Sequence, residues 1–319
     1  MDWNLSSGGK IVYRVCQGIA ALIIALSFLL TPMPPDAPAL FPFALTLAAT
    51  FLLAFLVRVF AGNNAGAISL ILISLYPGFS YSSDRALALF CLSALMSLIA
   101  TRNCAGHPRD NVTLCLALVV PVALGWYMKL CLLPLSAAIG FAYLLLCYVP
   151  PDSIRPYRTL LKSLRNRSGA RWELLAITVA GLLSLFPLLL SSATRLHSAV
   201  NSAMADPVRY FLAVTRLFFQ FLTTGESMDT LPALLTPVLL IASSVTLWWL
   251  FVSAQSGSGL PLSLTAIPVA YLLSGALGLV AGRSYAHPVY PILLANLIIF
   301  LGIWLRGRAN KRVLDSTRD

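Results

Sequence analysis

Apolar residues run along this chain in ten long blocks, which are separated by charged residues or prolines. The blocks cover residues 12–31, 39–57, 65–79, 85–101, 112–128, 130–149, 173–193, 231–254, 261–281 and 289–305. A helix needs about 20 apolar residues to cross the hydrocarbon core of a bilayer. The pattern therefore predicts an all-α, polytopic transmembrane protein with about ten spans.

The composition strengthens this prediction and leaves no room for a soluble domain. Apolar residues make up 59% of the 319 residues and charged residues only 10%, against about 45–50% and about 25% in soluble domains. We therefore expect one integral membrane domain over residues 1–319. The first block follows Lys10 and Arg14 as in a signal peptide, but a proline-rich stretch at 31–38 replaces a clean cleavage site. This favours a helix that is retained and either crosses the membrane or lies on it.

The basic residues predict an orientation, because cytoplasmic loops of membrane proteins are enriched in Lys and Arg. If the N-terminus is cytoplasmic, sixteen of the 22 basic residues fall inside, in a basic loop at 151–172, a basic tail at 306–319 and at Lys10, Arg14, Arg58, Arg102 and Arg109. Both termini are then cytoplasmic. These residues are interpreted as topogenic, and no aromatic residues interleave with them to stack bases, which argues against nucleic acid as a partner.

The longest outer loop covers residues 191–230, and an amphipathic helix is predicted within it at 208–222. Asp206 followed by Pro207 is typical of a helix start, with a capping side chain before a proline at the first helical position. Apolar residues then recur at helical spacing on one face, while Arg209 and Arg216 lie on the other. Such a helix lies in the membrane interface with its arginines toward the headgroups.

Chemistry on the outer face must come from few ionisable side chains. They are Asp36, Asp84, Arg85, Lys129, Arg195, His197, Asp206, Arg209, Arg216, Glu226, Asp229, Arg283 and His287. No HExxH, GxSxG, P-loop or GxGxxG pattern occurs, so metalloprotease, serine-hydrolase and nucleotide-driven functions lack support. The six cysteines show no paired spacing, which favours small buried hydrophobic residues over disulfides or metal ligands.

Two aspartates are candidate catalytic carboxylates. Asp84 and Arg85 stand between two apolar blocks, where Asp84 either caps the following helix or, with Arg85, holds a polar substrate group. Asp36 lies in the stiff proline-rich loop after the first block. It is either a solvated turn residue or a general base that removes a proton from an acceptor hydroxyl.

Other outer residues are candidate substrate-binding groups. Arg283, Tyr285 and His287 converge in the short segment 282–288, as phosphate-binding partners or as interfacial anchors. Arg195 and His197 follow the seventh apolar block in a similar way. At the tight turn after the fifth block, Trp126 and Tyr127 are aromatic-belt anchors or sugar-stacking rings, next to a snorkelling Lys129.

The order of these features resembles a known family. The segment 75–84 (LYPGFSYSSD), a following apolar helix, the segment 124–129 (LGWYMK) and then a long outer amphipathic segment are similar to the phage-type serotype-converting O-antigen glucosyltransferases. That family belongs to the GT-C fold of glycosyltransferases that use polyprenyl-phosphate sugars. The segment 282–287 (GRSYAH) also resembles the arginine, tyrosine and histidine loop before a late helix in GT-C enzymes.

The resemblance implies transfer of a sugar, with glucose expected, from a polyprenyl-phosphate carrier to a cell-surface polysaccharide or lipopolysaccharide O-antigen. The reaction would take place on the outer face of a bacterial inner membrane, with a small flippase as a further partner and a requirement for a divalent cation left open. Family members usually carry one or two acidic residues in a long first outer loop, and here the loop at 31–38 offers only Asp36. Asp2 is the other candidate if the chain begins late, with its N-terminus outside.

Three other hypotheses stay open at this stage. The chain is a degenerate family member without activity, or a non-enzymatic polysaccharide or lipid-carrier translocase or a polymerase partner, or a small-solute transporter. Transport needs charged residues inside the spans, and the apolar blocks here are nearly free of charge, which disfavours the translocase and the small-solute transporter.

Overall fold

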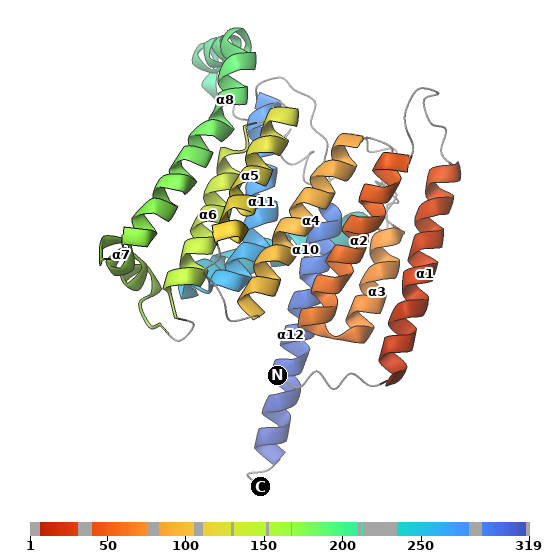
Figure 1. Cartoon of the computed structure of the whole chain (residues 1–319). Helices are drawn as coiled ribbons and strands as arrows, with labels where there is room; N and C mark the ends of the chain where they lie inside the picture. The colour runs from red at the N-terminus through yellow and green to blue at the C-terminus, as the bar shows by residue number, and fades with distance from the viewer. Residues whose placement is uncertain are drawn as a thin grey trace. The chain divides into compact units, whose positions relative to one another are not determined.

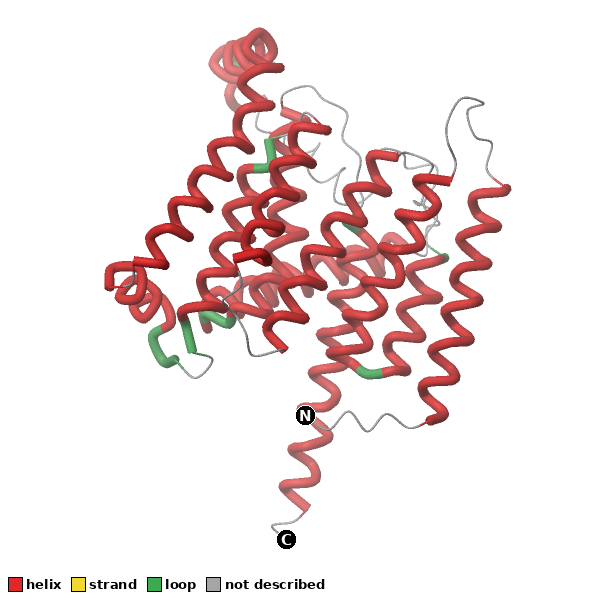
Figure 2. Tube along the Cα trace, viewed as in Figure 1, coloured by secondary structure: helices red, strands yellow, loops and turns green. Residues whose placement is uncertain are grey.

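A computed structural model describes residues 7–30, 40–75, 83–104, 111–128, 131–150, 153–166, 168–209, 212, 235–280 and 289–316. Within these residues the chain is helical and contains no strand (Figures 1 and 2). The helices are α1 (Ser7–Leu30), α2 (Leu40–Ala61), α3 (Asn63–Ser74), α4 (Ser83–Cys104), α5 (Asn111–Met128), α6 (Leu133–Tyr148), α7 (Pro156–Asn166), α8 (Ser168–Ala205), α10 (Leu235–Ser256), α11 (Gly259–Val280) and α12 (Tyr290–Ser316). The predicted all-α class is confirmed, and each of the ten apolar blocks overlaps one helix.

The lengths of the helices decide which of them can cross a membrane. Among the described residues, the stretches Gly9–Leu29, Leu40–Ala61 and Asp84–Thr101 are long and apolar enough. The bent pair α7 and α8 passes the same test if both helices are taken together. The apolar stretches of the other helices are shorter, as in Leu240–Ser256, Gly259–Gly275 and Tyr290–Leu305. The helix α3 has 12 residues and extends about 18 Å, against a hydrocarbon core of about 30 Å. The chain therefore has the helices of a membrane protein, and a total of about ten spans stays a prediction.

The contacts divide the chain into two compact units, where the sequence analysis expects one membrane domain. Unit 1 comprises Met1–Ser97 and Tyr290–Asp319, and unit 2 comprises Leu98–Val289. The division arises because the last helix, α12, packs against α2 and α3 near the start of the chain.

In unit 1, a cluster of side chains joins α1, α2 and α3 at one end. Gly62, with a φ of 99°, allows the sharp turn from α2 into α3. Next to this turn Arg58 donates a hydrogen bond from Nε to Asn63 Oδ1 over 2.8 Å. The Arg58 Cζ atom also lies 4.8 Å from the centroid of the Tyr13 ring of α1. A cation–π contact and a charged hydrogen bond thus connect three helices.

Small residues bring the helices of unit 1 close together. Ala20, Ala54 and Ala67 are buried in the core between α1, α2 and α3, where small side chains allow close packing of membrane helices. A methyl group on Gly302 of α12 would overlap Ala61 at the end of α2. The rest of α12 therefore extends beyond the end of α2 (Figure 1).

In unit 2, α6 packs against α5, α7, α8 and α11. Its contact with α8 is close, because a methyl group on Gly140 would overlap Ile177. The buried hydroxyls of Ser136 and Ser184 share a hydrogen bond of 2.8 Å across the same interface. Close approach at small residues together with an interhelical hydroxyl bond is a common way to associate helices in membranes.

Several segments predicted as loops are helical in the structure. The basic segment 151–172 contains α7, α8 continues through the first part of the predicted loop 191–230, and α12 covers most of the predicted tail 306–319. These segments are too polar for a hydrophobicity pattern, but they contain no strong helix breaker in their interiors. Helix ends are set by local signals instead: α7 starts at Pro156, and α8 stops before Asp206 and Pro207.

Candidate functional site

The candidate carboxylate Asp84 and its neighbour Arg85 lie at the start of α4. The helix begins at Ser83, so Asp84 occupies the first turn and is not the N-cap, one residue from the predicted position. A carboxylate in the first turn is still stabilised by the helix dipole. Asp84 is exposed, whereas Arg85 is half-buried and its Nε atom is buried. Because adjacent helical residues do not share a face, the carboxylate and the guanidinium present themselves in different directions.

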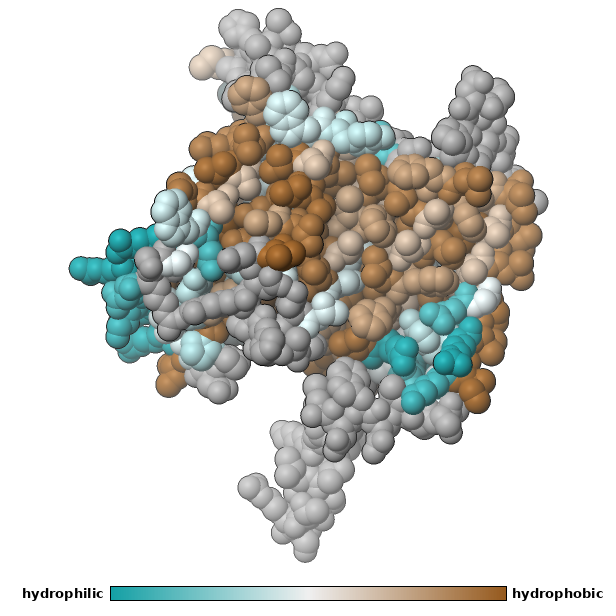
Figure 3. All heavy atoms as spheres, in the orientation of Figure 1, coloured by the Kyte–Doolittle hydropathy of each residue, from teal (hydrophilic) through white to brown (hydrophobic). Residues whose placement is uncertain are grey.

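This site lies at the end of unit 1 opposite to the basic end. Figure 1 draws the start of α4 at the end where α1 and α3 finish, away from the turn at Gly62. The exposed side chains of Lys10 and Arg14 at the start of α1 and the half-buried Arg58 lie at the other end. Figure 3 shows hydrophilic side chains gathered there, over the ends of α1, α2 and α3. Asp84 is thus separated from Lys10, Arg14 and Arg58 by the length of the helices.

In unit 2, the aromatic residues Trp126 and Tyr127 lie at the end of α5. The Trp126 ring stacks on Phe186 of α8, with centroids 5.7 Å apart and planes at 21°. Tyr271 of α11 donates a hydrogen bond from its hydroxyl to the Met128 sulfur over 3.7 Å. Tyr127 between them is exposed. Both rings are partly exposed, Trp126 at 45% and Tyr127 at 56%, and the Trp126 ring also packs on α8.

The predicted helix start at Asp206 is confirmed by a capping hydrogen bond. The backbone N–H of Arg209 donates to Asp206 Oδ1 over 3.1 Å, as expected for an N-cap and the third helical residue. Both side chains are exposed. The remainder of the predicted amphipathic helix, 208–222, lies outside the described residues apart from positions 208, 209 and 212.

The other predicted site residues are placed only in part. Arg195 and His197, expected just after a helix, lie within α8, whose backbone continues to Ala205; their side chains lie outside the described part of the structure. Also outside the described residues are Asp2, Asp36, Lys129, Arg216, Arg283, Tyr285 and His287. Of the predicted residues that the structure describes, Asp84 and Arg85 are neighbours in the chain whose side chains point in different directions, and Asp206 accepts a hydrogen bond from the backbone of Arg209.

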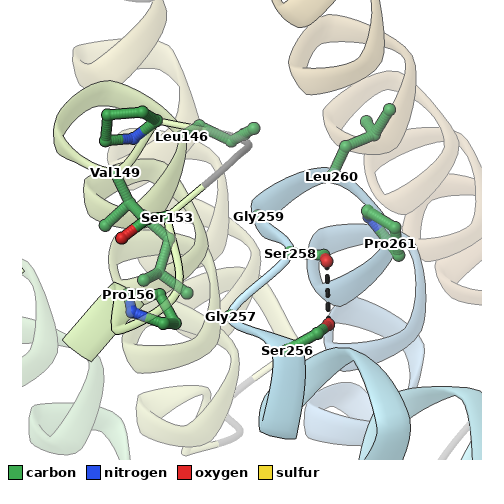
Figure 4. Close-up of a pocket in the computed structure, with 12 residues that line it drawn as sticks. Leu146, Val149, Ser153, Pro156, Ser256, Gly257, Ser258, Gly259, Leu260 and Pro261 are labelled. Atoms are coloured by element: carbon green, nitrogen blue, oxygen red, sulfur yellow. Dashed lines mark hydrogen bonds between the residues drawn. The ribbon is translucent and has the colours of Figure 1, made fainter.

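A cavity at the basic end of unit 2 was not predicted. It has a volume of about 190 Å³ and lies between the end of α6, the start of α7 and the turn from α10 to α11. Figure 4 shows the hydroxyls of Ser256 and Ser258 joined by a hydrogen bond on one wall, with an Oγ–Oγ distance of 2.8 Å. Ser153 lies on the opposite wall, and its hydroxyl is 3.1 Å from Thr159 Oγ1. The serines and glycines between two apolar blocks were the available signal for this turn.

Neither metal-binding residues nor similarity to known proteins identifies the function of the described site. In the part of the chain that the structure describes, no three His, Cys, Asp or Glu side chains lie together in a way that could hold a metal ion. No family model, no curated protein and no solved structure matches the chain. The resemblance to GT-C enzymes therefore rests on the sequence segments quoted above, and function is argued from the site.

Proposed function

We propose that this protein is a membrane glycosyltransferase that transfers a sugar, glucose by resemblance, from a polyprenyl-phosphate carrier to a surface polysaccharide or O-antigen. Its location is the bacterial inner membrane, with both termini in the cytoplasm and the reaction on the outer face. The observation that carries the proposal is the exposed Asp84 beside Arg85, at the end of unit 1 opposite to Lys10, Arg14 and Arg58. The positive-inside rule assigns the basic end to the cytoplasm and hence this carboxylate to the outer surface.

The proposed reaction is a displacement at the anomeric carbon of the carrier-linked sugar. An aspartate accepts the proton of an acceptor hydroxyl as the hydroxyl oxygen bonds to the anomeric carbon. The bond between that carbon and the phosphate oxygen breaks, and the electron pair leaves with the polyprenyl phosphate. Arginine is suited to neutralise this leaving group, because its guanidinium binds phosphate with paired hydrogen bonds. Asp84 and Asp36 are the two candidate bases, and Arg85 is the described candidate for the phosphate.

The distribution of charge along the helices favours this enzyme over a translocase with a charged path. In the described helices the stretches 15–30, 86–101, 174–194 and 290–305 contain no charged residue. Transport of a charged or strongly polar group through the spans would need ionisable side chains at membrane depth. A reaction at the membrane surface does not.

The test is the sugar composition of surface glycans from cells that express the wild type or a variant. One of the two aspartates is the proposed base, so either Asp84→Asn or Asp36→Asn should lower the rate of sugar transfer by about 10²-fold or more. Arg85→Gln should weaken binding of the polyprenyl-phosphate donor. Asp206→Asn is a matched control, since this carboxylate has a capping role. The amount of each protein in the membrane is measured in parallel. Full glycan modification by both the Asp84 and the Asp36 variants would refute the proposal.

A further inference from the structure

An apolar groove runs along unit 2 between α5 and α8. It has a volume of about 500 Å³, and its walls include Cys115, Val119 and Val122 of α5 and Trp172, Ala176 and Leu183 of α8. The spacing of three or four residues places each set on one face of its helix. From Trp172 to Leu183 the groove extends along α8 for about 16 Å, close to one leaflet of a hydrocarbon core of about 30 Å. Its length therefore fits an acyl chain.

The helix α7 packs against α6 and α8, directly before the part of α8 that lines the groove. Its axis is bent by 103° from that of α8, so if α8 crosses a membrane, α7 lies nearly in the membrane plane. Leu160 is buried in the core of unit 2. Ile154, before the helix, and Leu161 are 96% and 66% exposed and form a second stripe. This arrangement is typical of a helix that inserts apolar side chains at headgroup depth.

A third stripe around α7 is basic and leads to the groove. Arg155, Arg158, Lys162 and Arg165 recur at helical spacing and are exposed. Figure 3 shows hydrophilic side chains over α7 beside the hydrophobic surface of α5 and α8. Four cations in one stripe attract anionic headgroups by about 1 kcal/mol each.

Two arginines mark the mouth of the groove. Arg171 lies one helical turn before Leu175, which lines the groove, and Trp172, which also lines the groove, is 71% exposed. The Arg171 guanidinium donates from Nη2 to the backbone oxygen of Arg165 over 2.6 Å, which holds both residues at the junction of α7 and α8. The nearby carboxylate of Glu173 has its Oε2 atom buried. Positive charge therefore dominates the exposed surface at this end.

We propose that the groove binds an anionic phospholipid of the surrounding membrane, with an acyl chain between α5 and α8 and the phosphate at Arg165 and Arg171. This site is independent of the glycosyltransferase function proposed above.

A second copy of the chain fits the groove less well than a lipid does. Two copies share one orientation in a membrane, and a symmetric interface brings the same patch together, so the basic stripes of α7 would face each other at the same depth.

The experiment uses the full chain in nanodiscs of phosphatidylcholine that contain an equal share of either brominated phosphatidylglycerol or brominated phosphatidylcholine. Bromine atoms quench tryptophan fluorescence at short range, and the contribution of Trp172 is the difference between the wild type and Trp172→Phe. We expect the brominated anionic lipid to quench Trp172 more strongly. Arg165→Gln combined with Arg171→Gln should reduce this preference on the order of tenfold.

One double variant controls for the loss of charge, and one pair of single variants controls for folding. Lys10→Gln with Arg14→Gln removes the same charge from unit 1 and should keep the preference. Ala176→Phe fills the groove and should abolish the quenching of Trp172, whereas Leu182→Phe changes an exposed residue of α8 outside the groove lining and should not. Equal quenching by the two lipids in the wild type, or an unchanged preference in the double arginine variant, would overturn the proposal. So would cross-linking of two copies through Cys115 without quenching by either lipid, because the groove would then be an interface between copies.

Discussion

At the scale of single residues, the turn from α10 to α11 depends on one glycine. Gly257 has a φ of 63°, in the left-handed region that residues with a Cβ atom avoid. Its missing side chain also leaves room for the Pro156 ring at the start of α7, which a methyl group would overlap. The same position thus sets the backbone of one turn and the contact of that turn with another helix (Figure 4).

We predict that Gly257→Ala destabilises the protein by about 2–4 kcal/mol, from backbone strain together with overpacking against Pro156. The measurement is the apparent midpoint of thermal unfolding in detergent, at a fixed heating rate. Gly169→Ala is the control, because a methyl group there meets no atom within 4 Å and alanine is the better helix former. Equal midpoints for the two variants would show that neither the backbone conformation nor the Pro156 contact limits stability.

Residue-level features differ in how far the sequence can predict them. The cap at Asp206 was predicted from two consecutive residues, Asp206 and Pro207, and the hydrogen bond that Asp206 accepts from the Arg209 backbone is present. The contact of Gly257 with Pro156 joins residues far apart in the chain, so no local sequence pattern predicts it. The same limit applies to the candidate site: Asp84 and Arg85 are visible as polar residues between apolar blocks, but the groups that meet them depend on tertiary packing.

At the scale of elements, the apolar helices were predictable, whereas the polar helix α7 and the polar extensions of α8 and α12 were not. The ten apolar blocks each overlap a helix, since apolar runs of this length are a strong signal. The basic helix α7 was missed because its amphipathic pattern is short and rich in charge, although Pro156 and the regular spacing of its basic residues are helix signals. Helix α8 extends to Ala205, past the point where hydrophobicity falls, since polar residues continue a helix as well as apolar ones.

The junction of α1, α2 and α3 gives a prediction at this scale. Arg58→Met keeps an apolar stem but removes the hydrogen bond to Asn63 and the contact with the Tyr13 ring. We expect a loss of about 1–3 kcal/mol in the free energy of unfolding, measured as a lower thermal midpoint. Arg14→Met removes the same charge from an exposed position of α1 and should change the midpoint little.

A double-mutant cycle isolates the bond between the two residues at that junction. Arg58→Met and Asn63→Ala should together cost less than the sum of the single changes, because both remove the same interaction. Strictly additive losses would mean that the hydrogen bond contributes nothing to holding α2 against α3.

At the scale of the whole molecule, each unit taken by itself carries a group of basic residues at one end. In unit 1 the start of α1 and the turn at Gly62 share that end, and α12 carries the C-terminal basic residues past the end of α2 (Figure 1). In unit 2 a second group lies on α7 and at Arg171, whereas Arg209 lies past the other end of α8. The packed structure thus groups charges that the linear sequence spreads over five segments. Such grouping is what the positive-inside rule requires of a protein whose basic ends all remain in the cytoplasm.

This arrangement predicts the outcome of fusions to alkaline phosphatase, which is active only outside the cytoplasm. A fusion after Arg165 in α7 and a fusion to the C-terminus of the full chain should be inactive, whereas a fusion after Gly225 should be active. Replacing Arg155, Arg158, Lys162 and Arg165 by glutamine should raise the activity of the fusion after position 165, since basic residues close to a span hold their segment inside. Equal protein amounts are verified by immunoblotting. If the fusion after Arg165 is active in the unsubstituted chain, unit 2 has the opposite orientation and the proposed lipid site lies in the outer leaflet. If the C-terminal fusion is active, the end of α12 lies outside and Asp84 does not lie at the outer surface.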